Sequence, residues 1–142
     1  MTKKRGDEMF LASVWEWVLP IGLGLVVGIM ITMRKKYDFS QIVFLEPEEF
    51  RLNMRKGQLI DVRREDNFNH RRINGSRSFP NRTVFSSLSR LRRDQAIFLY
   101  DENCKNSVKR IAKKLIKKGF KPVYVLKNGL EKWPFPIKED TK

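Results

Sequence analysis

A short polar segment, Asp101 to Ser107, contains a carboxylate and the only thiol of the chain. It follows the apolar stretch Ala96–Tyr100 and precedes a segment with helical periodicity. Backbone N–H groups of a tight loop converge there with the positive end of the helix dipole, an arrangement that favours an anion. The candidate loop residues are Asp101, Glu102, Asn103, Cys104, Lys105, Asn106 and Ser107.

Two side chains of this loop are candidates for the central group of a site. Cys104 would lie near a helix N-terminus and beside Lys105, and both neighbours would lower the pKa of the thiol and favour the nucleophilic thiolate. Asp101 brings a carboxylate that either occupies and rigidifies the cradle of N–H groups or simply faces water. Whether Cys104 carries sulfur or redox chemistry, or is an incidental loop thiol, stays open at this point.

A cluster of arginines follows the apolar stretch Gln58–Val62, and its members are Arg63, Arg64, Arg71, Arg72, Arg77 and Arg82. Functional loops of parallel sheets follow the carboxyl ends of the strands, so part of this cluster should border the Asp101 loop. Guanidinium groups bind carboxylates and phosphates well. We predict Arg63 and Arg72 as candidate anion-binding residues; the alternative is a solvated basic surface.

The composition restricts the chemistry further. One cysteine excludes an intramolecular disulfide, and one cysteine with one histidine cannot complete a four-ligand zinc site. We therefore expect no metal and no cofactor. A lone free thiol fits a reducing, cytoplasmic setting.

Apolar strands that alternate with helices position these groups. The predicted strands are Gln41–Leu45, Gln58–Val62, Ala96–Tyr100 and Val123–Leu126. Three helices are predicted. The first begins at Glu46–Glu49 and ends at Gly57, and the second covers Thr83–Arg93. The third is capped by Ser107, runs to Lys118 and ends at Gly119. Strands that are apolar throughout are typical of a parallel sheet with both faces covered, so we predict an α/β fold.

The N-terminal part of the chain differs from the rest. From Phe10 to Met33 it is apolar except for Glu16, and the segment Trp15–Met33 would span roughly 28 Å as a helix, close to the thickness of a hydrocarbon core. Three basic residues follow directly: Arg34, Lys35 and Lys36. The run is too long for a cleaved signal peptide, and no small-residue cleavage site follows it. We predict a transmembrane anchor in residues 1–36 and a soluble domain in residues 37–142.

Charge indicates the partners. The formal net charge of +14 favours anionic partners, and the lysines of the Ser107–Lys118 helix could each gain about 1 kcal/mol near an anionic leaflet. The numbers of basic residues on the two sides of the anchor are nearly equal, so the positive-inside rule does not decide its orientation. The large domain is basic and carries a free thiol, and for these reasons we place it in the cytoplasm. We expect membrane lipid, and a protein partner or small anion. Nucleic acid is not expected, because the aromatic residues fall mostly in segments predicted to be buried.

Several motifs occur in an order and spacing that resemble the rhodanese superfamily, over roughly Phe44 to Pro136. They are Glu46–Phe50, Leu59–Arg63, Glu65, Phe68, Ile73–Pro80, Ala96–Tyr100, Gly119–Phe120, Val123–Leu126 and Asn128–Trp133. The resemblance implies a sulfur-transfer site whose cysteine directly follows the strand Ala96–Tyr100. It also implies a loop arginine immediately before the next helix.

This chain departs from that pattern where the chemistry would occur. Asp101 stands at the position of the cysteine and Asn106 at that of the loop arginine, while Arg72 replaces a histidine. Sulfur transfer needs a thiolate that can hold a persulfide, and a carboxylate cannot form that bond. We therefore expect a membrane-anchored, non-catalytic binding or regulatory module. The alternative is a membrane-bound sulfurtransferase or thiol redox protein that uses Cys104.

Overall fold

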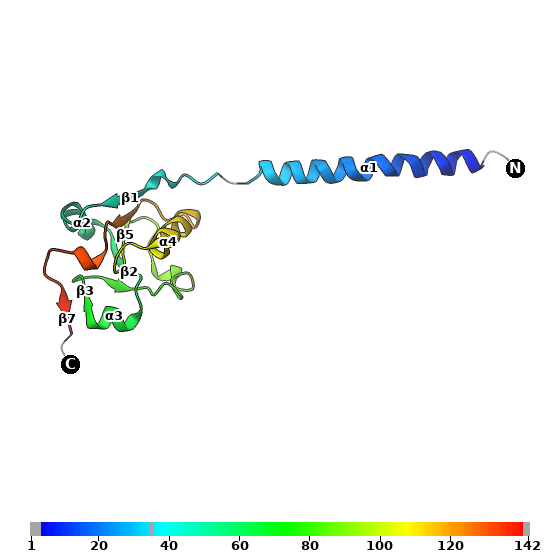
Figure 1. Ribbon diagram of the computed structural model, residues 1–142. Coiled ribbons are helices and arrows are strands. Elements are labelled where there is room, and N and C mark those ends of the chain that lie inside the picture. The colour runs from blue at the N-terminus through cyan, green and yellow to red at the C-terminus, as the bar shows by residue number, and fades with distance from the viewer. Residues whose placement is uncertain (1–3, 35, 141–142) are drawn as a thin grey trace. The chain divides into compact units, whose positions relative to one another are not determined.

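The computed structural model describes residues 4–34 and 36–140 and divides the chain into two compact units, Met1–Lys36 and Tyr37–Lys142 (Figure 1). Lys35 of the predicted basic triplet lies outside the described residues. Each unit is described by itself.

The first unit consists of one helix, α1 (Lys4–Thr32), which continues through Pro20. Its part Ser13–Thr32 comprises 20 residues with a mean hydropathy of 2.0. By length and composition, this helix could cross a membrane. Near its end, the Thr32 hydroxyl donates a hydrogen bond of 2.8 Å to the carbonyl of Gly28, so this polar group is satisfied within the helix.

The second unit alternates strands and helices. Its elements in chain order are η1 (Phe39–Gln41), β1 (Ile42–Leu45), α2 (Pro47–Asn53), η2 (Met54–Lys56), β2 (Gln58–Asp61), α3 (Glu65–His70), β3 (Arg71–Arg72), β4 (Arg77–Ser78), η3 (Leu88–Arg90), β5 (Ile97–Tyr100), α4 (Asn106–Lys117), β6 (Val123–Leu126), η4 (Leu130–Lys132) and β7 (Lys138–Glu139). Pro47 occupies the first turn of α2, where its missing N–H costs nothing.

Five strands form one parallel sheet in the order β1-β6-β5-β2-β4, and β3 pairs antiparallel with β7 in a small second sheet. The predicted α/β fold with a parallel central sheet is confirmed. Strands β2 and β5 are buried along their whole length. The apolar sequence of β5 predicts this, whereas β2 also buries its polar end residues Gln58 and Asp61. Because β5 lies between β6 and β2, the loop that follows it emerges at the centre of the carboxyl edge of the sheet.

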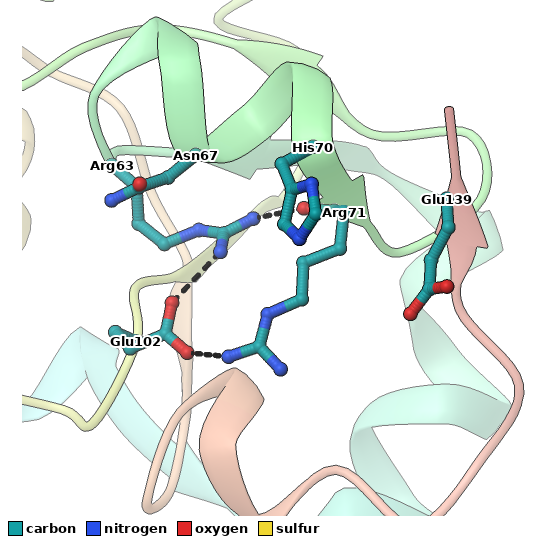
Figure 2. Close-up of a pocket in the computed structure, with 6 residues that line it drawn as sticks. All are labelled: Arg63, Asn67, His70, Arg71, Glu102 and Glu139. Carbon is teal, nitrogen blue, oxygen red and sulfur yellow. Dashed lines mark hydrogen bonds and ion pairs between the residues drawn. The ribbon is translucent and has the colours of Figure 1, made fainter. Parts of the chain in front are cut away.

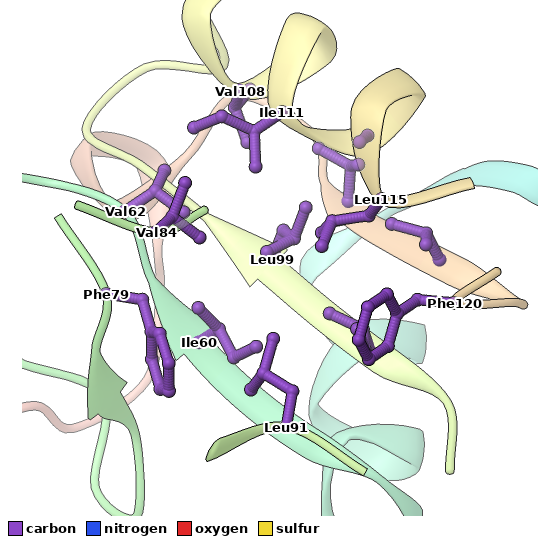
Figure 3. Packing of buried hydrophobic residues seen from close by; sticks show 14 of the residues in the cluster. Ile60, Val62, Phe79, Val84, Leu91, Leu99, Val108, Ile111, Leu115 and Phe120 are labelled. Atoms are coloured by element: carbon purple, nitrogen blue, oxygen red, sulfur yellow. The ribbon is translucent and has the colours of Figure 1, made fainter. Parts of the chain in front are cut away.

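Successive residues of β5 serve two separate cores. Ile97 and Leu99 pack with the apolar stripe of α4 on one face (Figure 3), and Phe98 and Tyr100 pack with α2 and η4 on the other. All five predicted stripe residues of α4 are buried: Val108, Ile111, Ala112, Leu115 and Ile116. The sheet is therefore a rigid platform, covered on both faces, for the loops at its edge.

Gly119 ends α4 as predicted. Its φ is +89°, a left-handed conformation that glycine adopts without steric cost. The N–H groups of Gly119 and Phe120 donate to the carbonyls of Ile116 and Leu115, both at 3.0 Å. These are the two hydrogen bonds of a Schellman C-cap.

The prediction of a helix over Thr83–Arg93 was wrong. The segment forms consecutive turns followed by the short 3₁₀ helix η3. The side-chain hydroxyls of Thr83 and Ser86 donate to the carbonyls three residues earlier, and these bonds compete with the α-helical pattern. The apolar spacing that suggested a helix instead reflects burial of Val84 and Leu91 against the core.

Candidate functional site

Hydrogen bonds from the backbone of η4 fix the loop between β5 and α4. The N–H groups of Leu130 and Glu131 donate to the carbonyls of Asp101 and Glu102, both at 2.8 Å. Gly129 lies against the same loop: a Cβ at this position would come within 2.5 Å of the backbone of Glu102 and Asn103. The segments around residues 101–106 and 127–129 are therefore in direct contact.

Asp101 occupies the cradle of N–H groups at the start of α4. Its side chain is buried, and its two carboxylate oxygens accept hydrogen bonds from the N–H of Cys104 at 2.6 Å and of Lys105 at 3.1 Å. Burial raises the pKa of this carboxyl, and the two backbone hydrogen bonds offset only part of that rise. Of the two arrangements considered for Asp101, the structure has the one in which the carboxylate is inside the cradle.

The helix α4 begins earlier than its predicted cap. The structure has Lys105 at the N-cap of α4, and no side chain of that residue bonds the first turn. Ser107 is the second residue of the helix, so its prediction as the cap was wrong. The Asp101 carboxylate accepts the N–H of Lys105 itself, which comes before the first turn.

Cys104 does not have the environment of a reactive thiol. The residue is half-buried and packs against the hydrophobic core under α4. Burial and the neighbouring Asp101 carboxylate raise the pKa of the Cys104 thiol, and Lys109 offsets this only in part. The prediction of a lowered pKa was wrong, because burial and the Asp101 carboxylate raise the pKa more than the neighbouring groups lower it.

Arg63 forms the centre of a buried charge network. Its guanidinium donates to both carboxylate oxygens of Asp61. It also donates to Glu102 at 2.8 Å and to the carbonyl of Arg71 at 2.5 Å (Figure 2). Burial alone would lower the pKa of Arg63, but the hydrogen bonds and charges of Asp61 and Glu102 raise it above its ordinary value. Asp61 is itself fully buried, and the Arg63–Glu102 pair links the segments that follow β2 and β5.

Arg72 is engaged at a different place. Its guanidinium forms a bidentate ion pair with Asp140, donates to the carbonyl of Phe68 and lies over the Phe68 ring at 5.0 Å. Carboxylates of the chain itself bind both guanidinium groups, and anion binding by Arg63 and Arg72 stays a prediction. The two residues also belong to different networks.

A pocket of about 420 Å³ opens beside this network (Figure 2). Six residues line it: Arg63, Asn67, His70, Arg71, Glu102 and Glu139. Glu102 bridges the two arginines of the pocket, while Arg71 is 38% exposed and keeps further N–H groups directed outward. The functional groups at its mouth include positively charged hydrogen-bond donors and negatively charged acceptors.

Sequence reasoning did not identify Asn67, Arg71 or Glu139 as part of one site. Glu139 reaches it because β7 pairs with β3, which sets Glu139 opposite Arg71. Two-residue strands leave no periodic signal in a sequence. Within residues 4–34 and 36–140, no group of three or more His, Cys, Asp or Glu side chains could hold a metal ion.

Glu102→Gln is expected to lower the free energy of unfolding by about 0.5–1 kcal/mol at neutral pH, the range of a partly exposed ion pair. Burial raises the pKa of Glu102, but Arg63 and Arg71 outweigh it and hold the pKa below the ordinary value. A carboxyl with a lowered native pKa stabilises the fold above its unfolded pKa and loses this contribution as the pH falls through the native pKa.

The difference between wild type and Glu102→Gln should therefore close on acidification, as measured by urea unfolding at a series of pH values. Glu131→Gln is the matched control, because Glu131 is an exposed residue of the neighbouring η4 and makes no ion pair within the described residues. A gap that widens on acidification would contradict the assignment of the charge network.

The parallel sheet, its order and the loop after the central strand define the class of this protein. The chain belongs to the Rhodanese-like domain family, whose profile matches residues 46–134. It is 37% identical over 122 residues to the uncharacterized protein YqhL of Bacillus subtilis (strain 168), a match that covers 83% of this chain and 94% of that protein.

Solved structures share the fold. A rhodanese-related protein from Thermoplasma volcanium superposes with a TM-score of 0.63 at 16% identity, covering 69% of this chain and 99% of that one. A rhodanese-like domain protein from Staphylococcus aureus superposes with a TM-score of 0.62 at 13% identity, covering 70% of this chain and 99% of that one. At these identities the likeness concerns the fold alone.

Proposed function

We propose that this chain is a membrane-anchored rhodanese-like module that binds a partner and transfers no sulfur. The observation that carries the proposal is the Asp101 carboxylate inside the N–H cradle, where a sulfur-transferring relative would build its persulfide. The donors that would stabilise a sulfur anion are already satisfied by an oxygen acid. The same carboxylate bonds the loop to itself, through the N–H groups of Cys104 and Lys105 directly before α4.

The partner is proposed to bind at the pocket beside the loop. Asn67, His70 and Arg71 present their side chains at its mouth, together with the carboxylates of Glu102 and Glu139. A mixed set of this kind suits a protein surface that carries both acidic and basic groups. A small anion would have to compete with Glu102 for both arginines, so the protein partner is favoured.

The alternative, sulfur transfer by Cys104, requires a thiolate at the centre of the cradle. Its raised pKa and its packing against the core both count against that role. Cys104 would have to leave the core, and Asp101 would have to leave the cradle, before a sulfur donor could be attacked.

Assays with thiosulfate and cyanide test this proposal. In a competent enzyme, the thiolate displaces sulfite from thiosulfate to form a persulfide, and cyanide then removes the outer sulfur as thiocyanate and restores the thiolate. We expect the full-length chain to form no more thiocyanate than Cys104→Ser, and no trapped persulfide. Thiocyanate formation that Cys104→Ser abolishes would overturn the non-catalytic assignment.

Asp101→Cys supplies a thiol at the cradle and is still expected to give little activity, because Asn106 provides no cation beside the developing sulfite. Asp101→Cys with Asn106→Arg supplies both groups, so it should exceed the single variant on the order of tenfold or more. Fast turnover by Asp101→Cys alone would show that the loop needs no added cation.

The anchor is proposed to be α1, with the soluble unit in the cytoplasm. The apolar part Ser13–Thr32 supports the anchor, and the free thiol and basic surface of the second unit support the side. Resistance of the intact chain to alkaline carbonate extraction tests the anchor, and digestion of intact cells by protease tests the side. A mature chain that lacks α1 would show that the segment is a cleaved signal sequence.

A further inference from the structure

The soluble unit exposes aromatic rings at one place. Within residues 36–140, the exposed large hydrophobic residues are Tyr37, Phe39, Val43, Phe44 and Leu52, so the three exposed aromatic residues all fall between positions 37 and 44. Their exposed fractions are 40%, 38% and 45% for Tyr37, Phe39 and Phe44. The core does not account for these rings.

Lysines of α4 lie directly over these rings. The ammonium of Lys109 is 5.9 Å from the centre of the Phe44 ring, that of Lys113 is 5.9 Å from Phe39, and that of Lys117 is 5.6 Å from Tyr37. The spacing of four residues places the three lysines along one side of the helix. Tyr37, Phe39, Phe44, Lys109, Lys113 and Lys117 together are named the aromatic–lysine surface.

The charged groups of this surface are its three lysines, and one carboxylate, that of Asp38, lies between Tyr37 and Phe39 in the sequence. None of its lysines makes an ion pair with a described residue, and α4 contains no acidic residue. The acidic group nearest in sequence to the rings, Asp38, uses its carboxylate to accept the N–H of Ser40. Ammonium groups beside amphipathic rings match the chemistry of a bilayer interface with anionic headgroups.

The position of this surface in the chain limits where it can lie. The candidate span ends at Thr32, and Tyr37 follows five residues later, so the two are separated by at most about 17 Å even in a fully extended chain. If α1 crosses the membrane, the first residue of the aromatic–lysine surface must therefore stay near the headgroups.

We propose that the aromatic–lysine surface docks the soluble unit on a leaflet that contains anionic phospholipid. This inference rests on the proposed anchoring by α1. Lysine ammonium groups would contact lipid phosphates, and the rings of Tyr37, Phe39 and Phe44 would enter the interface. Strand β1 lies at one edge of the sheet, three strands away from β2, so docking at this edge leaves the pocket beside Arg63 accessible to a soluble partner.

Hydrogen exchange of the full-length chain in vesicles tests the proposal. Because β1 is an edge strand, part of its N–H groups have no strand partner and exchange quickly unless a surface covers them. We expect exchange over residues 37–45 to slow in vesicles of phosphatidylcholine with phosphatidylglycerol, relative to phosphatidylcholine alone. Each lysine should contribute about fivefold, and the three on the order of 100-fold, to the docking equilibrium, and high salt should remove the difference.

Two triple variants make the test specific. Lys109→Glu/Lys113→Glu/Lys117→Glu should abolish the lipid-dependent protection, whereas Lys56→Glu/Lys132→Glu/Lys138→Glu, which changes equally exposed lysines on other elements, should preserve it. Equal midpoints of urea unfolding confirm that both triple variants fold. If one of them does not fold, the variant with Lys→Gln at the same three positions takes its place.

The outcomes separate the proposals. If the chain floats with the vesicles, either of two results would overturn the docking surface. One is equal hydrogen exchange in both lipids, and the other is an equal loss of lipid-dependent protection in both triple variants. A chain that does not float with neutral vesicles would overturn the anchor instead. Protection that rises with the protein-to-lipid ratio and not with phosphatidylglycerol would show that a second copy covers this edge, and would also overturn lipid docking.

Discussion

Asp61→Ala is expected to lower the free energy of unfolding of the soluble unit by about 3–5 kcal/mol. Asp61 is fully buried and binds Arg63, whose own side chain is only 3% exposed. The substitution would leave a guanidinium charge buried with one partly exposed partner, Glu102. Urea unfolding of the full-length chain in detergent micelles, followed by near-ultraviolet circular dichroism, measures the loss.

The control for this prediction is Arg92→Ala. Arg92 and Asp94 also form an ion pair at 2.7 Å, but their side chains are 65% and 64% exposed. Water screens such a pair, so its removal should cost much less than the loss of Asp61. If both substitutions cost the same, burial of the Asp61–Arg63 pair is not what stabilises this region.

A double variant separates lost charge pairing from lost volume. Asp61→Leu with Arg63→Met removes both charges and keeps apolar volume, so it should be clearly more stable than Asp61→Ala. A double variant as unstable as Asp61→Ala would indicate that shape, rather than an unpaired charge, is the cause.

Gly129→Ala is expected to destabilise the soluble unit by about 2–5 kcal/mol and to loosen the loop between β5 and α4. Gly129 has φ +68° and ψ −166°, a region of backbone conformation that is essentially confined to glycine and costs other residues about 1–3 kcal/mol. The added Cβ would also lie 2.5 Å from the Glu102 carbonyl carbon and from the Asn103 nitrogen. Backbone atoms cannot move aside as a side chain can, so overpacking adds about 1–3 kcal/mol.

Gly75→Ala is the matched control, because Gly75 also has a positive φ, +85°, but a Cβ there would meet no atom within 4 Å. It should cost only about 1 kcal/mol. Urea unfolding measures both substitutions, and hydrogen exchange over residues 101–105 should accelerate in Gly129→Ala alone. Equal costs for the two alanines would refute the close approach of Gly129 to the loop.

Much of the fold could be predicted because its signals are local. Runs such as Leu59–Ile60 and Ile97–Leu99 are apolar at every position, and only a strand buried on both faces requires that pattern. The stripe of α4 repeats at helical spacing, and Gly119 stands where a left-handed residue ends the helix. The identity of the residue after β5, Asp101, was also available from the sequence.

The helix predicted over Thr83–Arg93 failed because the same apolar spacing fits a turn-rich segment whose hydroxyls bond to nearby carbonyls. The predicted direction of the Cys104 pKa failed for a related reason. A helix N-terminus can be inferred from sequence, but the burial of the thiol and the closeness of the Asp101 carboxylate depend on how the loop packs.

The sequence by itself determined four of the five strands of the central sheet, the helix that follows the loop, the apolar N-terminal segment and the carboxylate in place of a sulfur carrier. Tertiary structure alone decided that Asp101 fills the cradle and that Arg63 and Arg72 are bound by Glu102 and Asp140, which lie 39 and 68 residues away along the chain. The physical reason is that periodicity and burial repeat along neighbouring residues, whereas charge pairing depends on which distant segments the sheet brings together.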